Sequence, residues 1–280
     1  MASDFDLTLN PPSRLIDEIT TLASRAAAAI RRIDAASRAE RAKSDGTPVT
    51  AADEAAQAVI LAGLSRILPG VPVVSEEMSA AERPKTLTSH FVLVDPLDGT
   101  KEYLAGRDEF TINIALMVSG SPAFGCIAAP GLGLVWRGTV GQGAERLALA
   151  AGADASQCSS KTPIRTRPWL GRDAIALVSR SHLDPQTERF LAGIPGTKQV
   201  ACGSSLKFCK LAEGSADIYP RLAPTSEWDV AAGHAILVAA GGAVVMPDAA
   251  RPVYGRTADF RVPGFLAFGD ANAVRSILKS

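Results

Sequence analysis

The sequence predicts an α/β protein in which helices pack on β-sheets. Two long helical patterns come first, a series of short apolar runs separated by turn residues follows, and strands then alternate with helices to the C-terminus. Apolar residues make up 47% of the 280 residues, which is enough to bury the sizeable core that such a fold needs.

The N-terminal part reads as two helices. Leu15, Ile19 and Leu22 begin an apolar series at helical spacing, which predicts a helix over residues 13–40 with Ser13 as its N-cap. A loop over residues 43–48 comes next. The second helix is expected over residues 51–68, capped by Thr50 and ended by a Pro-Gly pair.

Short apolar runs then predict strands at residues 71–75, 91–95, 110–118, 123–128 and 133–136. Gly, Ser and Pro residues separate the later runs, and this spacing is typical of an antiparallel meander. Residues 141–171 are small, polar and irregular. We place a soft boundary there, which divides the chain into an N-terminal α+β subdomain (1–150) and a C-terminal α/β subdomain (151–280).

The second half predicts alternating strands and helices. The strands are expected at residues 174–179, 217–219, 243–246 and 265–268, and the helices at residues 185–192, 206–213, 227–240 and 271–279. Gly241-Gly242 is a stop signal for the third of these helices. The C-terminal extension, residues 270–280, receives no function.

Composition excludes several classes of function. Lys and Arg number 29 and so do Asp and Glu, which argues against a binder of nucleic acid polymers or of membrane surfaces. Four cysteines without metal-site spacing indicate free thiols in a reducing compartment. With no secretion signal and no transmembrane segment, we expect a cytoplasmic monomer or homodimer, and the sequence leaves open a peripheral contact with the inner membrane.

A pair of carboxylates lies at the end of the strand expected at residues 91–95. Pro96 holds Asp95 extended at the strand end, and the turn that must follow brings Asp98 toward the same point. Two clustered carboxylates repel each other unless a cation lies between them, and oxygen ligands favour a hard cation such as Mg²⁺. For this segment alone, a turn with a helix cap remains the alternative.

The residues around the pair fit the same idea. Leu97 can offer its carbonyl oxygen, and Gly99 lets the backbone approach a ligand closely. Thr100 and Lys101 begin a helical turn whose amides suit a phosphate group.

Three further carboxylates occupy similar positions in the predicted fold. Glu76 and Glu77 directly follow a strand, and Asp229 lies in the first turn of an apolar helix. Each alone has an ordinary explanation, a solvated turn or a favourable charge at a helix N-terminus. Acidic residues at three such ends of one α/β protein together indicate a metal site.

These motifs resemble the inositol monophosphatase superfamily. The resemblance rests on Ser75-Glu76-Glu77, on the hexapeptide that begins at Asp95 and on Trp228-Asp229, which occur in the order and at about the spacing of that superfamily. It covers roughly residues 16–268. The superfamily fold is a layered α-β-α-β-α sandwich, which agrees with the elements predicted above.

Within the superfamily the chain is more similar to the CysQ-type 3'(2'),5'-bisphosphate nucleotidases. Lys101-Glu102 follows Thr100, where inositol phosphatases usually carry Thr and Asn. Other segments that resemble the nucleotidases lie at residues 48–53, 179–182, 203–209 and 219–221.

The resemblance implies a role for each motif residue. Glu76, Asp95, the Leu97 carbonyl, Asp98 and Asp229 would bind two or three Mg²⁺ ions, and Glu77 would hold a metal-bound water. Asp53 and Thr100 would orient and deprotonate the attacking water. From position alone, Asp53 reads as an early-helix charge and Thr100 as an N-cap.

The implied reaction is removal of the 3'-phosphate of adenosine 3',5'-bisphosphate, giving AMP and phosphate in sulfur metabolism. Amides at Gly99 and Thr100 would bind the phosphate that is cleaved. The polar and positively charged groups that could bind the substrate are Lys101, Ser204, Ser205, Lys207 and Arg221. An inositol or sugar monophosphatase is the alternative, and a catalytically silent metal or nucleotide binder is disfavoured because every motif position is filled.

Overall fold

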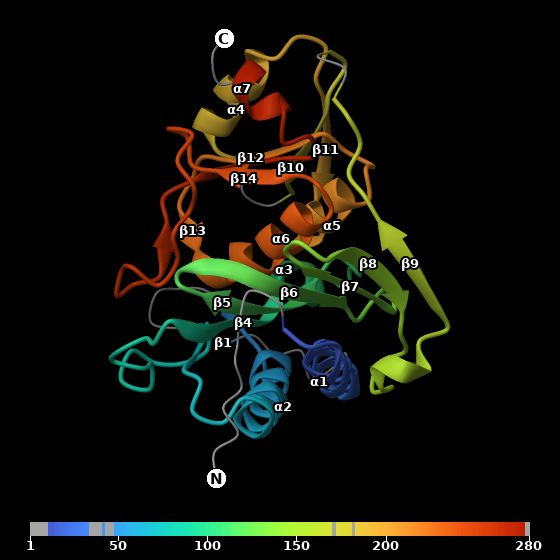
Figure 1. Cartoon of the computed structure of the whole chain (residues 1–280), viewed down its shortest axis with the longest axis vertical. Coiled ribbons are helices and arrows are strands. Elements are labelled where there is room, and N and C mark those ends of the chain that lie inside the picture. The colour runs from blue at the N-terminus through green and yellow to red at the C-terminus, as the bar shows by residue number, and fades with distance from the viewer. Residues whose placement is uncertain (1–10, 34–40, 43–47, 170–171, 181–182, 278–280) are drawn as a thin grey trace.

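Two β-sheets alternate with three layers of helices (Figure 1). The computed structural model describes residues 11–33, 41–42, 48–169, 172–180 and 183–277. Helices α1 (Ser13–Arg32) and α2 (Ala51–Ile67) cover the outer face of the first sheet, and α5 (Leu206–Ala212) and α6 (Glu227–Ala239) lie between the sheets. Helices α4 (Pro185–Ala192) and α7 (Ala273–Ile277) cover the second sheet. This arrangement confirms the expected layered sandwich.

The first sheet has seven strands in the order β3-β4-β5-β6-β7-β8-β9. Their bounds are β3 Val73–Ser75, β4 His90–Asp98, β5 Thr111–Val118, β6 Ser121–Ala129, β7 Leu134–Thr139, β8 Gly143–Ala148 and β9 Ser160–Ile164. The strands from β4 to β9 are antiparallel neighbours, as the meander predicts, whereas β3 runs parallel to β4.

The stretch at residues 141–171 was expected to be irregular, and this expectation is wrong for β8 and β9. A tight turn whose glycines Gly141 and Gly143 have φ of 84° and 106° joins β7 to β8. The stretch also contains a 3₁₀ turn (Ala155–Gln157). Four of the five residues of β9 are exposed, so the strand has no apolar alternation for a sequence pattern to reveal.

The second sheet has the order β11-β10-β12-β16-β14. Its strands are β10 Ile175–Ser179, β11 Lys198–Cys202, β12 Ile218–Arg221, β14 Ala243–Val245 and β16 Phe265–Phe268. The edge strand β11 was not predicted, because most of its side chains are exposed. Two small ladders pair β1 (Arg41–Ala42) with β2 (Pro48–Val49) and β13 (Thr225–Ser226) with β15 (Arg261–Val262).

Several predicted helix ends need correction. Helix α1 ends at Arg32 rather than at residue 40, because Ile33 turns into extended backbone with φ −74° and ψ 116°. Pro12 rather than Ser13 occupies its N-cap position. The predicted continuation at residues 34–40, the loop residues 43–47 and the last residues of the predicted C-terminal helix lie outside the described residues.

Helix α6 packs on the first sheet at backbone distance. A Cβ atom at Gly125 of β6 would lie 2.2 Å from the Ala232 carbonyl oxygen, and one at Gly138 of β7 would lie 2.8 Å from Ile236 Cα. Only glycine allows this approach without displacing the helix. The position of α6, and therefore of its N-terminal turn, is fixed by the sheet.

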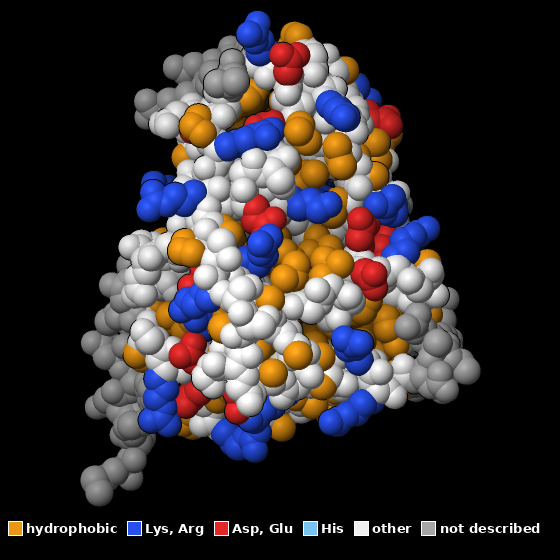
Figure 2. Space-filling view, turned by 90° about the vertical axis from the view of Figure 1, so that its right-hand side faces the viewer, with side chains coloured by type: hydrophobic (Ala, Val, Ile, Leu, Met, Phe, Trp, Pro, Cys, Tyr) orange, Lys and Arg blue, Asp and Glu red, His pale blue; other side chains and the backbone are white. Residues whose placement is uncertain are grey.

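Charges of both signs mix at the surface. Figure 2 shows Lys and Arg side chains interspersed with Asp and Glu over the face that it draws, in keeping with their equal numbers. Within the part of the chain that the structure describes, no helix has the length and apolar character needed to cross a membrane.

Candidate functional site

A β-bulge places Asp95 and Asp98 on the same face of β4. Asp95 lies opposite Asn113 of β5, and Asp98 lies opposite Thr111, with an irregularity in the register between them. Side chains alternate along a strand, so two residues three positions apart would ordinarily point to opposite faces. The extra residue in the bulge returns the second side chain to the face of the first. Both carboxylates therefore face the layer of α5 and α6.

Two more carboxylates reach the same point from other elements. Glu76 follows β3, and its amide donates to the Val94 carbonyl at 3.1 Å. Carboxylate oxygens of Glu76, Asp95 and Asp229 lie within 4.8 Å of one another. Because Asp229 is at the N3 position of α6, the close packing of that helix on the sheet also fixes its carboxylate.

The last of these carboxylates is also a helix cap. Asp229 Oδ2 accepts a hydrogen bond from the Thr225 hydroxyl and another, 3.3 Å long, from the Ser226 amide. Ser226 and Asp229 form a capping box, a pattern that the order Ser-x-x-Asp could have revealed. Asp229 is therefore both a capping residue of α6 and a member of the carboxylate cluster.

Burial and mutual repulsion raise the pKa values of the central pair. Burial and then the charges of Glu76, Asp98 and Asp229 hold the pKa of Asp95 well above its usual range. Burial and then Asp229 raise the pKa of Asp98 to about 7, against the opposing charges of Lys207 and Arg221. Such a cluster is costly while all its carboxylates are ionised without a counter-charge, and a divalent cation would relieve the repulsion.

These shifts predict that cation binding strengthens as pH rises through about 7. Below that pH a cation must displace a proton from Asp98, and above it the carboxylate is already ionised. Because the native pKa is raised, the cation-free protein loses stability as pH rises from about 4 to about 7. We expect Mg²⁺ to raise the melting temperature more at pH 8 than at pH 5, measured by thermal unfolding with Mg²⁺ and with EDTA. An equal shift at both pH values would contradict this electrostatic account.

A hydroxyl and a carboxylate meet beside the cluster. Thr100, the first residue of α3 (Thr100–Leu104), has its Oγ1 atom 3.4 Å from Asp53 Oδ1 and 3.3 Å from the Leu97 carbonyl oxygen. The other oxygen of Asp53 accepts from the Thr50 amide at 2.8 Å and the Thr50 hydroxyl at 2.6 Å. Asp53 is buried, so its orientation is set by these bonds. The predicted cap at Thr50 is confirmed.

The segment between β11 and α5 closes over the carboxylates. The Ser205 amide donates to Asp98 Oδ2 at 2.6 Å. Gly99, with φ 91°, lies so close to this segment that a Cβ atom on it would be 3.3 Å from Ser204 Cβ. The two separate motifs of the sequence, around Asp98 and around Ser205, are therefore in direct contact.

An ion pair that no sequence motif predicted holds this segment from outside. The Gly203 amide donates to Glu109 Oε2 at 2.9 Å, and the same carboxylate accepts from Arg180 at 2.9 to 3.1 Å. Arg180 belongs to a segment that resembles the nucleotidases, but the resemblance did not predict which carboxylate pairs with Arg180. Ser181 and His182, which follow it, lie outside the described residues.

Two of the predicted cations lie near the cluster in different ways. Lys207 is buried and donates from Nζ to the Ser204 carbonyl at 2.6 Å and the Cys202 carbonyl at 3.1 Å. Arg221 is at the end of β12, and its charge acts on Asp98 and Asp229. The exposed Lys101 and the half-buried Glu77 lie at the ends of the motifs that contain them.

The donor set fits a hard divalent cation. Glu76, Asp95 and Asp229 offer oxygen atoms at close range, and Asp98 adds a fourth carboxylate near them. Mg²⁺ prefers carboxylate oxygens and water. A bound cation would offset the burial and the mutual repulsion that hold the pKa of Asp95 above its usual range.

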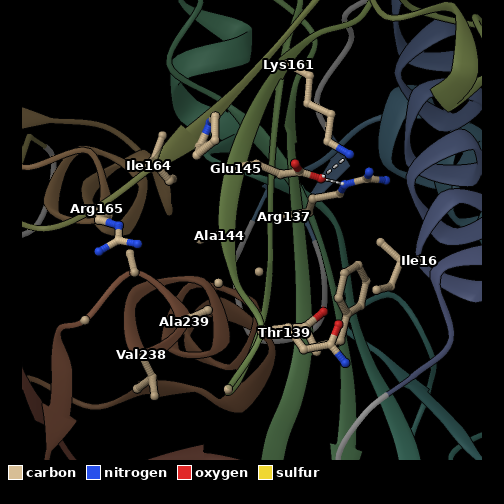
Figure 3. Close-up of a pocket in the computed structure, with 18 of the residues that line it drawn as sticks. Ile16, Arg137, Thr139, Ala144, Glu145, Lys161, Ile164, Arg165, Val238 and Ala239 are labelled. Atoms are coloured by element: carbon tan, nitrogen blue, oxygen red, sulfur yellow. Dashed lines mark hydrogen bonds and ion pairs between the residues drawn. The ribbon is translucent and has the colours of Figure 1, made fainter.

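A separate pocket of about 650 Å³ lies at the other end of α6 (Figure 3). Arg137 donates there to Asp17 and to Glu145, both at 2.7 Å, and Lys161 pairs with Glu145 at 3.2 Å. Val238 and Ala239 of α6 line it, whereas every predicted site residue lies outside its lining. This pocket is therefore distinct from the carboxylate cluster.

Comparison with known proteins places this geometry in a family. The model of the inositol monophosphatase family matches residues 13–267. A 3'(2'),5'-bisphosphate nucleotidase CysQ of Salmonella typhimurium is 41% identical over 232 residues, which are 82% of this chain and 89% of the relative. The corresponding protein of Escherichia coli K12 is 38% identical over the same shares.

Solved structures agree with the sequence relatives. The crystal structure of CysQ from Bacteroides thetaiotaomicron matches with a TM-score of 0.75 and 33% identity, over 93% of this chain and 98% of that one. An inositol monophosphatase from Anabaena matches with a TM-score of 0.72 and 24% identity, over 95% and 94% of the two chains, which supports the fold alone.

Proposed function

The chain belongs to the inositol monophosphatase family, and from this premise we propose that it is a magnesium-dependent 3'(2'),5'-bisphosphate nucleotidase. Its reaction would be hydrolysis of the 3'-phosphate of adenosine 3',5'-bisphosphate to AMP and phosphate. The observation that carries the proposal is the convergence of Glu76, Asp95 and Asp229 on one point, with the Thr100–Asp53 pair beside it.

The metal ligands would be Glu76, Asp95, the Leu97 carbonyl, Asp98 and Asp229. Two or three magnesium ions would supply neutralisation of the phosphate, a lowered pKa of the attacking water and stabilisation of the departing oxygen. Glu77 would accept a hydrogen bond from a coordinated water. The bulge in β4 supports this assignment, because it aims Asp95 and Asp98 at one side while Leu97 packs on the other.

The Thr100 hydroxyl and the Asp53 carboxylate would position the attacking water. The Thr100 hydroxyl can donate its one proton to Asp53 Oδ1 or to the Leu97 carbonyl, and either bond leaves its lone pairs to accept from water. A proton that leaves the water can pass through the hydroxyl to the carboxylate. The bonds from Thr50 keep Asp53 oriented for this role.

The second phosphate of the substrate needs cations beyond the metal centre. Arg221 is the best placed, because it is an arginine at a strand end whose charge acts on Asp98 and Asp229. Lys207 would add charge, while its bonds to two carbonyls shape the Ser204 backbone. Lys101 and the amides of Gly99 and Thr100 would contact the phosphate that is cleaved. The Ser204 hydroxyl is the remaining polar group that we propose as a substrate contact.

Ser205 would contribute through its backbone rather than its side chain. Its amide is bonded to Asp98, and its hydroxyl turns inward to Thr111 and Asn113. The side-chain contact to substrate that the sequence suggested for Ser205 is therefore not part of the proposal.

The cellular setting of the proposal rests on the thiols. Cys126, Cys158, Cys202 and Cys209 are all free. Four unpaired cysteines support a reducing compartment such as the cytoplasm, where we place the protein as a monomer or homodimer.

Three substrates test this proposal. Phosphate release should be about 10- to 100-fold faster, in kcat/KM, from adenosine 3',5'-bisphosphate than from adenosine 3'-monophosphate or inositol 1-phosphate, because charge-assisted bonds to the second phosphate are worth about 1.5–3 kcal/mol. EDTA should abolish all three rates and excess Mg²⁺ should restore them. Faster cleavage of inositol 1-phosphate would instead favour the inositol monophosphatase alternative, and EDTA-resistant turnover would remove the metal mechanism.

A further inference from the structure

Asn113 is a buried polar residue behind the carboxylate cluster. It lies on β5 directly opposite Asp95, with 1% of its surface exposed. Its neighbours Ala115 and Met117 at alternate positions pack with the core between the two sheets, so Asn113 faces the same layer as Asp95. No motif drew attention to it, since one Asn within an apolar strand has no sequence signature.

One end of the Asn113 amide holds the segment that closes over the site. Ser205 Oγ donates to Asn113 Oδ1 at 2.6 Å, and the Thr111 hydroxyl shares a bond of 2.8 Å with Ser205 Oγ. The backbone amide of the same Ser205 donates to Asp98 Oδ2. Asn113 therefore helps to fix the donor that orients one of the proposed metal ligands.

The other end of the amide is unsatisfied. Asn113 Nδ2 is buried without a hydrogen-bond partner among the residues that the structure describes. Leaving such a donor unpaired costs about 1–3 kcal/mol. Directly opposite residues of an antiparallel pair have Cβ atoms about 4.5–5.5 Å apart, so the register places this donor and the Asp95 carboxylate side by side on one face of the sheet.

We propose that Asn113 is a positioning residue of the carboxylate cluster. It fixes the Ser205 amide against Asp98 through Oδ1, and its Nδ2 donates to Asp95 when a divalent cation is bound. The inference rests on the proposed metal site. A metal-ligating carboxylate has one oxygen on the cation, and a hydrogen bond to the carboxylate fixes its orientation.

A purely structural role predicts a different outcome from a positioning role. If Asn113 only supported the fold, its replacement would lower the free energy of unfolding and leave cation affinity in the folded protein unchanged. On the positioning account, Asn113→Leu removes an unsatisfied buried donor together with the acceptor of the Ser205 hydroxyl, which can donate to Thr111 instead. The cation-free protein therefore loses little stability while cation affinity falls. Loss of a hydrogen-bond partner of a metal ligand typically costs about 10- to 100-fold in metal affinity.

The experiment measures Mn²⁺ and Mg²⁺ binding by calorimetry, and urea unfolding in EDTA, for the full chain and its variants. Asn113→Leu is compared with Asn113→Val, which suits a strand if leucine does not fit, and with Ser205→Ala, which removes only the Ser205 arm. We expect both Asn113 variants to bind the cation about 10- to 100-fold more weakly. Ser205→Ala should fall between them and the wild type, because it leaves Nδ2 in place.

The outcomes separate this inference from the proposed function. A wild-type protein that binds no divalent cation would refute the metal site itself. Wild-type binding together with Asn113 variants that bind within about threefold of it would overturn the positioning role alone. A Ser205→Ala loss equal to that of Asn113→Leu would overturn the direct bond to Asp95.

Discussion

Asp98→Asn is expected to lower kcat/KM for adenosine 3',5'-bisphosphate by about 10³-fold, or ~4 kcal/mol of transition-state stabilisation. The amide keeps an oxygen that can accept the 2.6 Å bond from the Ser205 amide, so the local fold should remain. What is lost is the negative charge near Asp229, which the cation needs. Without that charge the variant should also require more Mg²⁺ for half-maximal rate.

The stability of the same variant gives the second half of the test. Because Asp98 repels its neighbours in the cation-free protein, Asp98→Asn should unfold at the same or a higher temperature in EDTA at pH 8. Asp108→Asn is the matched control, because Asp108 is an exposed residue ten positions further on whose substitution should leave the rate unchanged. Near-normal activity of Asp98→Asn would remove this carboxylate from the metal site.

The sequence was sufficient to find the carboxylates but not to show how they meet. The positions of Glu76 and Asp229 at element ends are readable, because apolar runs mark where strands and helices stop. The convergence of Asp95 and Asp98 depends on a bulge in the β4–β5 register. A bulge is a property of two paired strands, so one strand's residues do not reveal it.

The orientation of side chains was beyond the sequence for a similar reason. The polar cluster at the start of α5 suggested that the Ser205 and Lys207 side chains face an anion, yet Ser205 Oγ turns toward Asn113 and Lys207 Nζ bonds to two carbonyls. The partner of Ser205 comes from a strand far away in the chain, and the partners of Lys207 are nearby backbone carbonyls, which a pattern of side chains does not reveal. In the fold, the elements with clear periodicity were predicted, and the exposed strands β9 and β11 were missed because solvent leaves them no apolar pattern.

The pair of Asp53 and Thr100 yields the second large prediction. Asp53→Asn and Thr100→Val should each lower kcat by about 10²- to 10⁴-fold, the usual contribution of a positioned proton acceptor, with little change in metal affinity. In Asp53→Asn an amide nitrogen can replace one carboxylate oxygen, so the side chain cannot accept from both Thr50 and Thr100 as Asp53 does. The associated loss of the capping box should cost only about 0.5–2 kcal/mol of unfolding free energy, measured in urea.

Three further variants decide whether the pair acts as a unit. Thr100→Ser keeps the hydroxyl and should stay within about tenfold of the wild-type rate, which separates the chemistry of the group from its shape. Glu54→Gln, the exposed neighbour of Asp53 on α2, is the matched control and should leave kcat unchanged. Because the proton would pass along a single path from water through Thr100 to Asp53, the double variant Asp53→Asn/Thr100→Val should be little slower than either single one. Fully additive losses would mean that the two residues act separately, and a Thr100→Val enzyme of normal rate would assign water activation to other groups.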